Sequence, residues 1–399
     1  MNKLIVGPLK ESGISTVIVI DALDECKDQE PASAILFVLE QFVAQIPNVK
    51  FFLTGRPEQR ILRGFHRPRL AEATDIFVLH GVEPSQVHGD IQLFFRQSFQ
   101  EIADNWSGLD GWPTEEQLDL LCKRAAGLFV YAMATVKFLD HQNNDPRDQL
   151  DLLLQSPECS DLEGDTELKA EMTMNSLYAS ILKGAFGKDH PRDDSKIRSV
   201  LGGVILASNP LSPSTIATLL GLRTTDVFNR LSAVHSLLIL QEDVNSPVRP
   251  FHKSFPDFIV NSTRCTSERF FVSPPQHHLE LLVGCFKLMN QTLEKNMCKL
   301  PDVVLNSEVD DLHGRIEQHL NPALQYACSS WHKHIVDEKA ICTPTVTSIL
   351  HQFLEKKFLF WLEVLSVLGA VKEAVDALGL VSRWLEVCSV SIWYSANPY

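Results

Sequence analysis

The chain has no phosphate-binding loop of the Walker A type. No G-x-x-x-x-G-K-[ST] occurs in its 399 residues. The nearest candidate, Gly184–Asp189, lacks the first glycine and has Asp where Ser or Thr is required. The backbone N–H cradle and the lysine that hold nucleotide phosphates in such loops are therefore missing from this sequence. We accordingly expect no independent ATP binding or hydrolysis.

Paired cysteines and a basic surface are also lacking. The nine cysteines are odd in number, and none forms CxxC or another metal spacing. This usage is typical of a reduced intracellular protein, so we expect a cytoplasmic location. A zinc site built from distant Cys and His stays open. The net charge of −14 disfavours nucleic acid as a partner, because non-specific binding needs a basic surface.

Long apolar runs and sequence repeats are absent too. No run reaches the roughly 18 to 20 residues of a membrane span, so we expect no membrane partner. The longest run, 358–371, contains Glu363 and predicts a buried helix. No WD40, ankyrin or TPR period is visible. The apolar content of 45% predicts packed cores, and the length allows two to four domains.

The stretch Val17–Glu25 organises the sequence. A β-branched run predicts a strand over Thr16–Ile20, buried on both faces because it is apolar without alternation. At the carboxyl edge of a parallel sheet, Asp21 could hold Mg²⁺ while Asp24 and Glu25 orient a water for attack on a phosphate. A buried strand before an acidic helix N-terminus explains the same residues, and the local sequence does not decide between the two.

A second apolar run, Lys50–Leu53, predicts another strand. The residues between, 34–43, have the apolar spacing of a helix packed on a sheet, so the three segments predict a βαβ crossover. Two parallel strands would place Thr54 and Arg56 near Asp21, where a cation could sense a γ-phosphate. An exposed loop arginine before a proline is the other interpretation of Arg56.

The two motifs together resemble a known family. VIVIDALDEC at 17–26 and FFLTGRPE at 51–58 are similar to the Walker B and sensor 1 segments of NACHT-type STAND NTPases. The likeness is closest to the fungal set in which a NACHT module precedes WD40 or other repeats. The resemblance implies a nucleotide-controlled switch in signal transduction and innate immunity, closed with ADP and oligomerising with ATP and Mg²⁺. It implies self-association or other NACHT proteins as partners.

The resemblance also assigns roles to individual residues. It implies that Asp21 is the metal ligand, that Asp24 and Glu25 are catalytic, and that Thr54 and Arg56 face the nucleotide. The family's P-loop lies upstream of the region that matches Met1. The chain thus resembles an N-terminally truncated member, and any catalysis would need a P-loop from a separate chain.

Residues 1–82 are therefore expected to be a partial NACHT α/β core, the remnant of a P-loop NTPase parallel sheet. The predicted strands correspond to the family's third, fourth and fifth strands, and they are Thr16–Ile20, Lys50–Leu53 and Asp75–Leu79.

Residues 83–160 have the helical pattern of a lid domain. Thr114-Glu115-Glu116-Gln117 predicts a capping box that begins a helix. Gly127, Leu128 and Phe129 match an A-x-G-L-F segment that packs near the adenine in the family. A tightly packed pair of helices in a core is the alternative interpretation of this segment.

Residues 161–265 predict a winged-helix domain, with two short helices followed by two strands. Ser212 can cap a helix that has Pro213 at its first position, and Thr224 or Thr225 can cap the next. Winged helices often bind DNA, but this one has few basic residues, so a DNA-binding regulator is the weakest of three interpretations.

His252 follows the second of these strands. Phe251–Phe258 resembles the winged-helix signature of NACHT proteins, whose His reaches the β-phosphate of bound ADP. The resemblance thus implies that His252 contacts nucleotide. A core His packed by neighbouring phenylalanines is an equally good explanation.

Residues 266–399 predict a helical linker region in which Trp331 and Trp361 anchor a core rather than form ligand platforms. The fold class expected for the whole chain is mainly α with a small α/β part. The function expected is a truncated NACHT/STAND switch module without autonomous ATP binding or hydrolysis. A non-enzymatic helical interaction scaffold or regulatory partner is the alternative.

Overall fold

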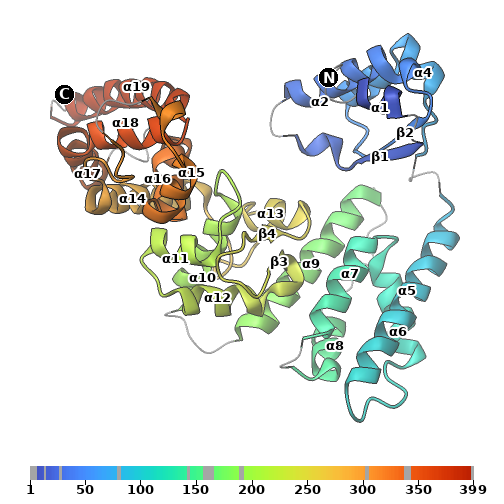
Figure 1. Cartoon of the computed structure of the whole chain (residues 1–399). Coiled ribbons are helices and arrows are strands. Elements are labelled where there is room, and N and C mark those ends of the chain that lie inside the picture. The colour runs from blue at the N-terminus through green and yellow to red at the C-terminus, as the bar shows by residue number, and fades with distance from the viewer. Residues whose placement is uncertain are drawn as a thin grey trace. The chain divides into compact units, whose positions relative to one another are not determined.

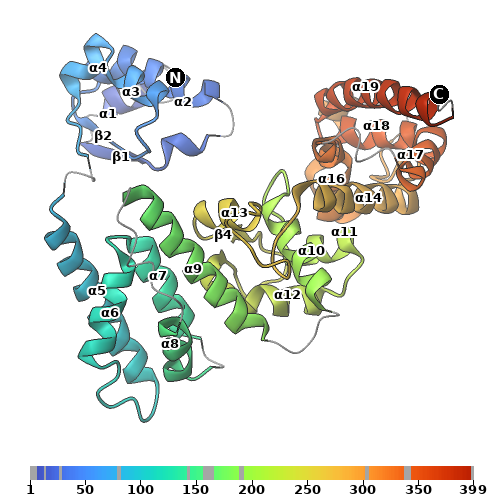
Figure 2. The same ribbon diagram turned by 180° about the vertical axis from the view of Figure 1, so that it is seen from behind.

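The computed structural model describes residues 7–12, 15–26, 29–78, 82–141, 144–155, 166–187, 193–301, 305–336 and 343–396. The chain divides into two compact units, Met1–Glu83 and Pro84–Tyr399 (Figures 1 and 2). The predicted fold class is confirmed, because helices dominate and the first unit has a small parallel sheet.

The first unit is built on a βαβ crossover. β1 (Thr16–Ile20) and β2 (Val49–Leu53) pair in parallel, with Thr16 opposite Val49 and Ile20 opposite Leu53. α2 (Gln29–Phe42) connects them, as a parallel pair requires. The strand, helix and strand predicted from the sequence are therefore present.

Helices cover one face of this sheet, as Figures 1 and 2 both show. A small core forms where α2, the loop after β1 and the helices after β2 meet, and its buried members are Leu23, Ala32, Leu36, Leu39, Ile61 and Leu70. The remaining elements of this unit are α1 (Gly7–Ser12), η2 (Leu23–Glu25), η3 (Val43–Gln45), α3 (Gln59–Phe65) and α4 (Pro68–Ala73).

The opposite face of the sheet is exposed, which corrects the prediction of a strand buried on both faces. Val17, Val19 and Phe52 keep 62%, 63% and 61% of their surface. Exposure alternates along β1 because successive side chains point to opposite faces. A continuous apolar run indicates that both faces of a strand are suited to burial. Burial of a face also requires other elements to pack on it, and the described residues provide helices for one face of this sheet.

The predicted strand over Asp75–Leu79 is also wrong for its described part. Residues 75–78 are not in a strand, and position 79 lies outside the described residues. Ile76, Phe77 and Val78 are exposed. A β-prone run becomes a strand only when a neighbouring strand accepts its backbone hydrogen bonds, and this run pairs with neither β1 nor β2.

The second unit begins with a group of antiparallel helices. Its helices up to residue 187 are α5 (Pro84–Asn105), α6 (Glu115–Ala125), α7 (Phe129–Leu139), α8 (Pro146–Leu154) and α9 (Thr166–Phe186). The predicted capping box is confirmed, since the Thr114 hydroxyl accepts from Gln117 N–H at 3.2 Å and the Gln117 side chain accepts from Thr114 N–H at 3.0 Å.

The middle of this unit has the predicted order of two short helices and two strands. Its elements are α10 (Asp194–Ile205), α11 (Pro213–Leu220), α12 (Thr224–Ala233), η6 (His235–Leu237), β3 (Leu238–Ile239), β4 (Arg249–Pro250) and α13 (Ser254–Ile259). β3 and β4 pair antiparallel. Ser212 caps α11 as predicted, accepting from Thr215 N–H at 3.2 Å.

The predicted cap of α12 is wrong. The N-cap position is Arg223, which makes no side-chain cap bond, and Thr224 is already helical. The Arg223 guanidinium instead donates to the Asp226 carboxylate with two contacts of 2.9 Å. An acid in the first turn suits the positive end of the helix dipole, so the N-terminus is stabilised without a hydroxyl cap.

The C-terminal helices complete the unit, and they are α14 (Pro274–Thr292), η7 (Asn306–Glu308), α15 (Leu312–His319), α16 (Pro322–Ser330), η8 (Trp331–His334), α17 (Pro344–Lys356), α18 (Phe358–Val367) and α19 (Val371–Ala396). One continuous core runs from Ile91 to Trp384. Trp331 and Trp361 are 1% and 0% exposed, which confirms them as core anchors.

Two glycines allow the C-terminal helices to approach the middle of the unit closely. A Cβ at Gly284 of α14 would lie 2.2 Å from the carbonyl oxygen of Leu219 in α11. A Cβ at Gly202 of α10 would lie 2.8 Å from the His277 ring. Residues after 266 are thus packed directly on the α10–α12 region.

Candidate functional site

Thr54 joins the carboxyl ends of the two parallel strands. Its hydroxyl donates to the Asp21 carboxylate and accepts from Ala22 N–H at 2.9 Å. Its own N–H donates to the Ile20 carbonyl at 3.0 Å, and its carbonyl accepts from Leu23 N–H at 2.9 Å. One residue therefore fixes both the Asp21 side chain and the backbone turn after β1.

The turn after β1 has an unusual backbone. Ala22 adopts a left-handed conformation with φ of 54°, which is uncommon for a residue with a side chain. The bonds from Thr54 on either side of Ala22 hold this conformation. The 3-10 helix Leu23–Glu25 follows directly, so the acidic residues lie in a fixed turn rather than in a loose loop.

Asp24 holds the arginine that follows β2. Its side chain is 4% exposed, and its carboxylate accepts from Arg56 N–H at 3.0 Å and lies 3.6 Å from Arg56 Nε. The Arg60 guanidinium donates to the Asp24 carbonyl at 3.2 Å. Arg56 itself keeps 54% of its side-chain surface exposed. A buried acid thus orients a cation that solvent and ligands can reach.

The structure brings four of the six predicted site residues to the carboxyl edge of the sheet. Asp21 and Thr54 are in contact, and Asp24 and Arg56 form an ion pair beside them. Glu25 belongs to η2, but its side chain lies outside the described residues. The chemical roles assigned to these residues stay predictions. The sequence did not indicate that Thr54 would make more hydrogen bonds at this edge than the acidic residues do.

The side chains at this edge could provide a protein ligand to a magnesium ion that is bound together with a nucleotide. Among the described residues, no group of three or more His, Cys, Asp or Glu could hold a metal by itself. Mg²⁺ at nucleotide sites usually takes one or two carboxylates, with phosphates and waters as its other ligands. Asp21, exposed and positioned by Thr54, is the carboxylate that could serve.

His252 lies in the second unit, just before α13. The His252 Nδ1 accepts from Ser254 N–H at 3.2 Å and lies 2.6 Å from the Ser254 hydroxyl. That hydroxyl is 2.6 Å from the hydroxyl of Tyr178 in α9, whose pKa burial raises to about 12. His252 is half-buried and held by a local network. Its predicted nucleotide contact stays a prediction.

The predicted lid segment presents an aromatic side chain. Gly127 has φ of 80°, a conformation that favours glycine, and it allows the chain to turn from α6 into α7. Phe129 then begins α7 with 43% of its surface exposed, its ring 6.1 Å from that of Phe94. An exposed aromatic ring at this position is compatible with either interpretation made from the sequence.

Two arginines of the predicted winged-helix region are paired with acids. Arg223 bonds Asp226, and Arg230 bonds Asp193. Both guanidinium groups therefore have a carboxylate partner, and the expectation that nucleic acid is not a partner stays a prediction.

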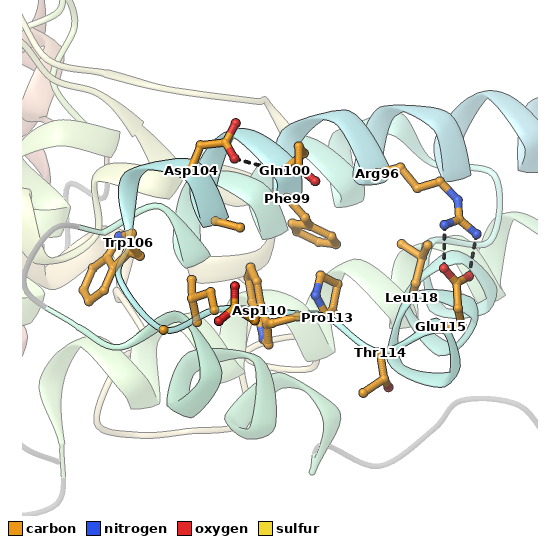
Figure 3. A pocket seen from close by; sticks show the side chains of 15 residues that line it. Arg96, Phe99, Gln100, Asp104, Trp106, Asp110, Pro113, Thr114, Glu115 and Leu118 are labelled. Atoms are coloured by element: carbon orange, nitrogen blue, oxygen red, sulfur yellow. Dashed lines mark hydrogen bonds and ion pairs between the residues drawn. The ribbon is translucent and has the colours of Figure 1, made fainter.

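A cavity of about 620 Å³ lies between the end of α5 and the start of α6. Figure 3 shows the Arg96–Glu115 ion pair at one end and Asp104 and Asp110 toward the other. The hydrogen bond from Arg96 lowers the pKa of Glu115. None of the predicted site residues lines this cavity.

Comparison with known proteins found a family match that includes the β1–α2–β2 segment. Residues 2–56 match the family model described as Nephrocystin 3, N-terminal. The matched segment ends at Arg56 and so contains Asp21, Asp24 and Thr54. Comparisons with curated proteins and with solved structures found no match. Among the described residues, no helix combines the length and apolar character needed to cross a bilayer.

Proposed function

We propose that this protein is a nucleotide-dependent switch module of the NACHT/STAND type that does not bind ATP tightly or hydrolyse it by itself. One observation carries the proposal. Parallel pairing of β1 and β2 brings Asp21 and Thr54 into contact at the carboxyl edge of a sheet, where open α/β folds bind ligands. The motif resemblance of residues 17–26 and 51–58 supports the same assignment.

Each side chain at this edge has a task in the proposal. Asp21 would be the protein ligand of Mg²⁺, held in place by the Thr54 hydroxyl. Arg56 would contact the terminal phosphate, because its guanidinium is half exposed and fixed by a buried carboxylate. A bound Mg²⁺ would neutralise phosphate charge. Asp24 is bonded to Arg56, so we assign it the positioning of that arginine.

The missing part of the site is the reason why the proposal includes no autonomous activity. No residue of this sequence replaces the backbone cradle and lysine of a P-loop. Metal and terminal-phosphate contacts alone supply a fraction of the binding free energy of a complete site. We therefore propose switching through partners, by self-association or with other NACHT proteins, in the cytoplasm, with His252 as the residue that senses phosphate in the second unit.

Metal-dependent nucleotide binding tests the proposal. Mn²⁺ replaces Mg²⁺, and water-proton relaxation reports its binding to the full chain with and without ATP. We expect the chain to bind Mn²⁺ weakly, with a dissociation constant of roughly 1 mM, and to bind it more tightly when ATP is present. We expect no hydrolysis of ATP. Asp21→Ala should abolish the Mn²⁺ binding, and Arg56→Ala should remove most of the ATP effect. Asp151→Ala, an exposed acid on α8, is the matched control.

The alternative scaffold function rests on a different observation. α19 exposes apolar residues at helical spacing, with Val371, Val375 and Leu378 at 53%, 68% and 41% of their surface. Such a stripe is typical of a helix that packs on a partner helix. If Mn²⁺ and ATP do not bind, or if Asp21→Ala binds them as the unmodified chain does, the scaffold function replaces the switch.

A further inference from the structure

Four residues form a continuous hydrogen-bonded chain inside the second unit, which we call the histidine relay: Ser208, Tyr326, His334 and His278. The Tyr326 hydroxyl lies 3.1 Å from the backbone N of Ser208 and 2.9 Å from Nε2 of His334. Nδ1 of His334 lies 2.8 Å from Nδ1 of His278. The relay connects the segment after α10 with α16, η8 and α14.

The donors in the relay determine where its protons lie. The Ser208 N–H can only donate, so the Tyr326 oxygen accepts it, and we assign the Tyr326 proton to the bond with Nε2 of His334. We therefore assign the proton of His334 to Nδ1, from which it is donated to Nδ1 of His278. Two nitrogens at this distance share one hydrogen, and with Nε2 of His334 as an acceptor these assignments leave both imidazoles neutral.

Burial keeps the relay in this state. His334 is 0% exposed, and burial, followed by the imidazoles of His278 and His332, lowers the pKa of His334 to about 3. Burial and then His277 lower the pKa of His278. Burial raises the pKa of Tyr326 to about 12. Each shift favours the neutral form of its group.

The elements that carry or contact the relay also contain other titratable groups, and they are His277, Glu280 and Cys285 on α14, Cys328 on α16, His332 and Lys333 on η8, and Glu373 on α19. Of these, His277 interacts with His278, Cys285 with Tyr326, and His332 with His334. Both carboxylates have partners of their own. Glu280 accepts from the Ser199 hydroxyl at 2.8 Å, and Glu373 lies 3.1 Å from His332 Nε2 and 3.4 Å from Lys333 Nζ.

The relay lies where the C-terminal helices meet the middle of the unit. The same contact is made tight by Gly284 against Leu219 and by Gly202 against His277. Close-packed interfaces of this kind cannot deform gradually to admit an extra proton and its hydration. We therefore expect an added charge in the relay to be accommodated by separation of the helices.

We propose that the histidine relay is an acid-sensitive contact that holds α16 and η8 on the segment after α10, and that acid releases the C-terminal helices from the α10–α12 region. With the Tyr326 proton on the Nε2 side of His334, protonation of His278 on Nδ1 would place two hydrogens between the two Nδ1 atoms. In the released form each histidine regains an ordinary pKa of about 6.5. Because the packed form has the lower pKa, release is favoured progressively as the pH falls below about 6.5.

Hydrogen exchange of the full chain tests the proposal. Protection factors of backbone amides in 322–334, corrected for the intrinsic pH dependence of exchange, should fall with decreasing pH by up to about tenfold per pH unit for each histidine that is released. His278→Asn keeps an oxygen that can accept from His334 Nδ1–H but does not titrate. We expect it to reduce this pH dependence by up to tenfold per unit.

His313→Asn is the matched control, because that side chain is 86% exposed on α15. It should leave the pH dependence unchanged. The same dependence in His278→Asn as in the unmodified chain would overturn the proposal. A second measurement needs no variant: nitrogen-15 spectra at neutral pH should show His334 protonated on Nδ1 and His278 on Nε2. An imidazolium at either residue at pH 7 would also overturn it.

Discussion

At the scale of single residues, Thr54 has more structural consequence than the acids around it. Its hydroxyl lies between the Ala22 N–H and the Asp21 carboxylate, and its backbone bonds both sides of the turn. Asp21 alone would be a mobile exposed carboxylate. The geometry of the site therefore depends on a residue whose sequence context indicated only a small polar side chain at a strand end.

Thr54→Val should loosen the carboxyl edge of the sheet. The change keeps the side-chain shape but removes the hydroxyl, so the Ala22 N–H loses its acceptor and Asp21 loses its donor. We expect a loss of about 1–2 kcal/mol in the local stability of the first unit. Hydrogen exchange of the β1 and β2 amides measures it.

Thr54→Ser is the control, because it keeps the hydroxyl at the same position. It should exchange nearly as slowly as the unmodified chain. Equal protection in Thr54→Val would contradict the assigned role of the hydroxyl.

Residue identity also explains which site predictions the sequence could support. Asp21, Asp24, Thr54 and Arg56 were placed together because parallel strands align their carboxyl ends. The pairing of Asp24 with Arg56 was not predicted, since it depends on the path of the turn 21–25 and the loop 54–58 in space. Sequence spacing determines which strand end a residue occupies, but not which side chain it meets there.

At the scale of elements, glycines determine how closely two helices approach each other, although glycine is unfavourable inside a helix. Gly284 lies inside α14, where glycine costs stability relative to alanine. Its missing Cβ lets the backbone of α11 come within contact distance. The cost within the helix is therefore offset by packing between helices.

Gly284→Ala and Gly379→Ala should act in opposite directions. The first places a Cβ 2.2 Å from the Leu219 carbonyl oxygen and must push α14 from α11, at a cost of about 1–3 kcal/mol or more. The second lies in α19 with open space around it, so we expect a gain of roughly 0.5–1 kcal/mol. Urea unfolding followed by tryptophan fluorescence measures both. A stabilising Gly284→Ala would contradict the close approach of these helices.

At the scale of the whole molecule, the two units differ in the size of their cores. The core of the second unit extends continuously from Ile91 to Trp384, whereas the buried cluster of the first unit is small and its sheet has an uncovered apolar face. Because hydrophobic stabilisation follows buried apolar area, the first unit should be the less stable of the two.

Two optical probes should therefore report different unfolding curves. The tryptophans all lie at position 106 or beyond, so their fluorescence reports on the second unit alone. We expect far-ultraviolet circular dichroism in urea to lose part of its signal at low concentration, before fluorescence changes. Coincident curves from the two probes would show that the chain unfolds as one cooperative body, contrary to this prediction.

The sequence by itself determined the local elements: the β1–α2–β2 crossover, the capping box at Thr114, the helix capped by Ser212 and the buried tryptophans. These follow from periodicity and from hydrogen bonds between residues close in sequence. Only the tertiary structure decided that one face of the sheet is bare, that residues 75–78 form no strand, and that the histidine relay exists. Each of those outcomes depends on which surfaces meet, and the four members of the relay come from segments up to 126 residues apart.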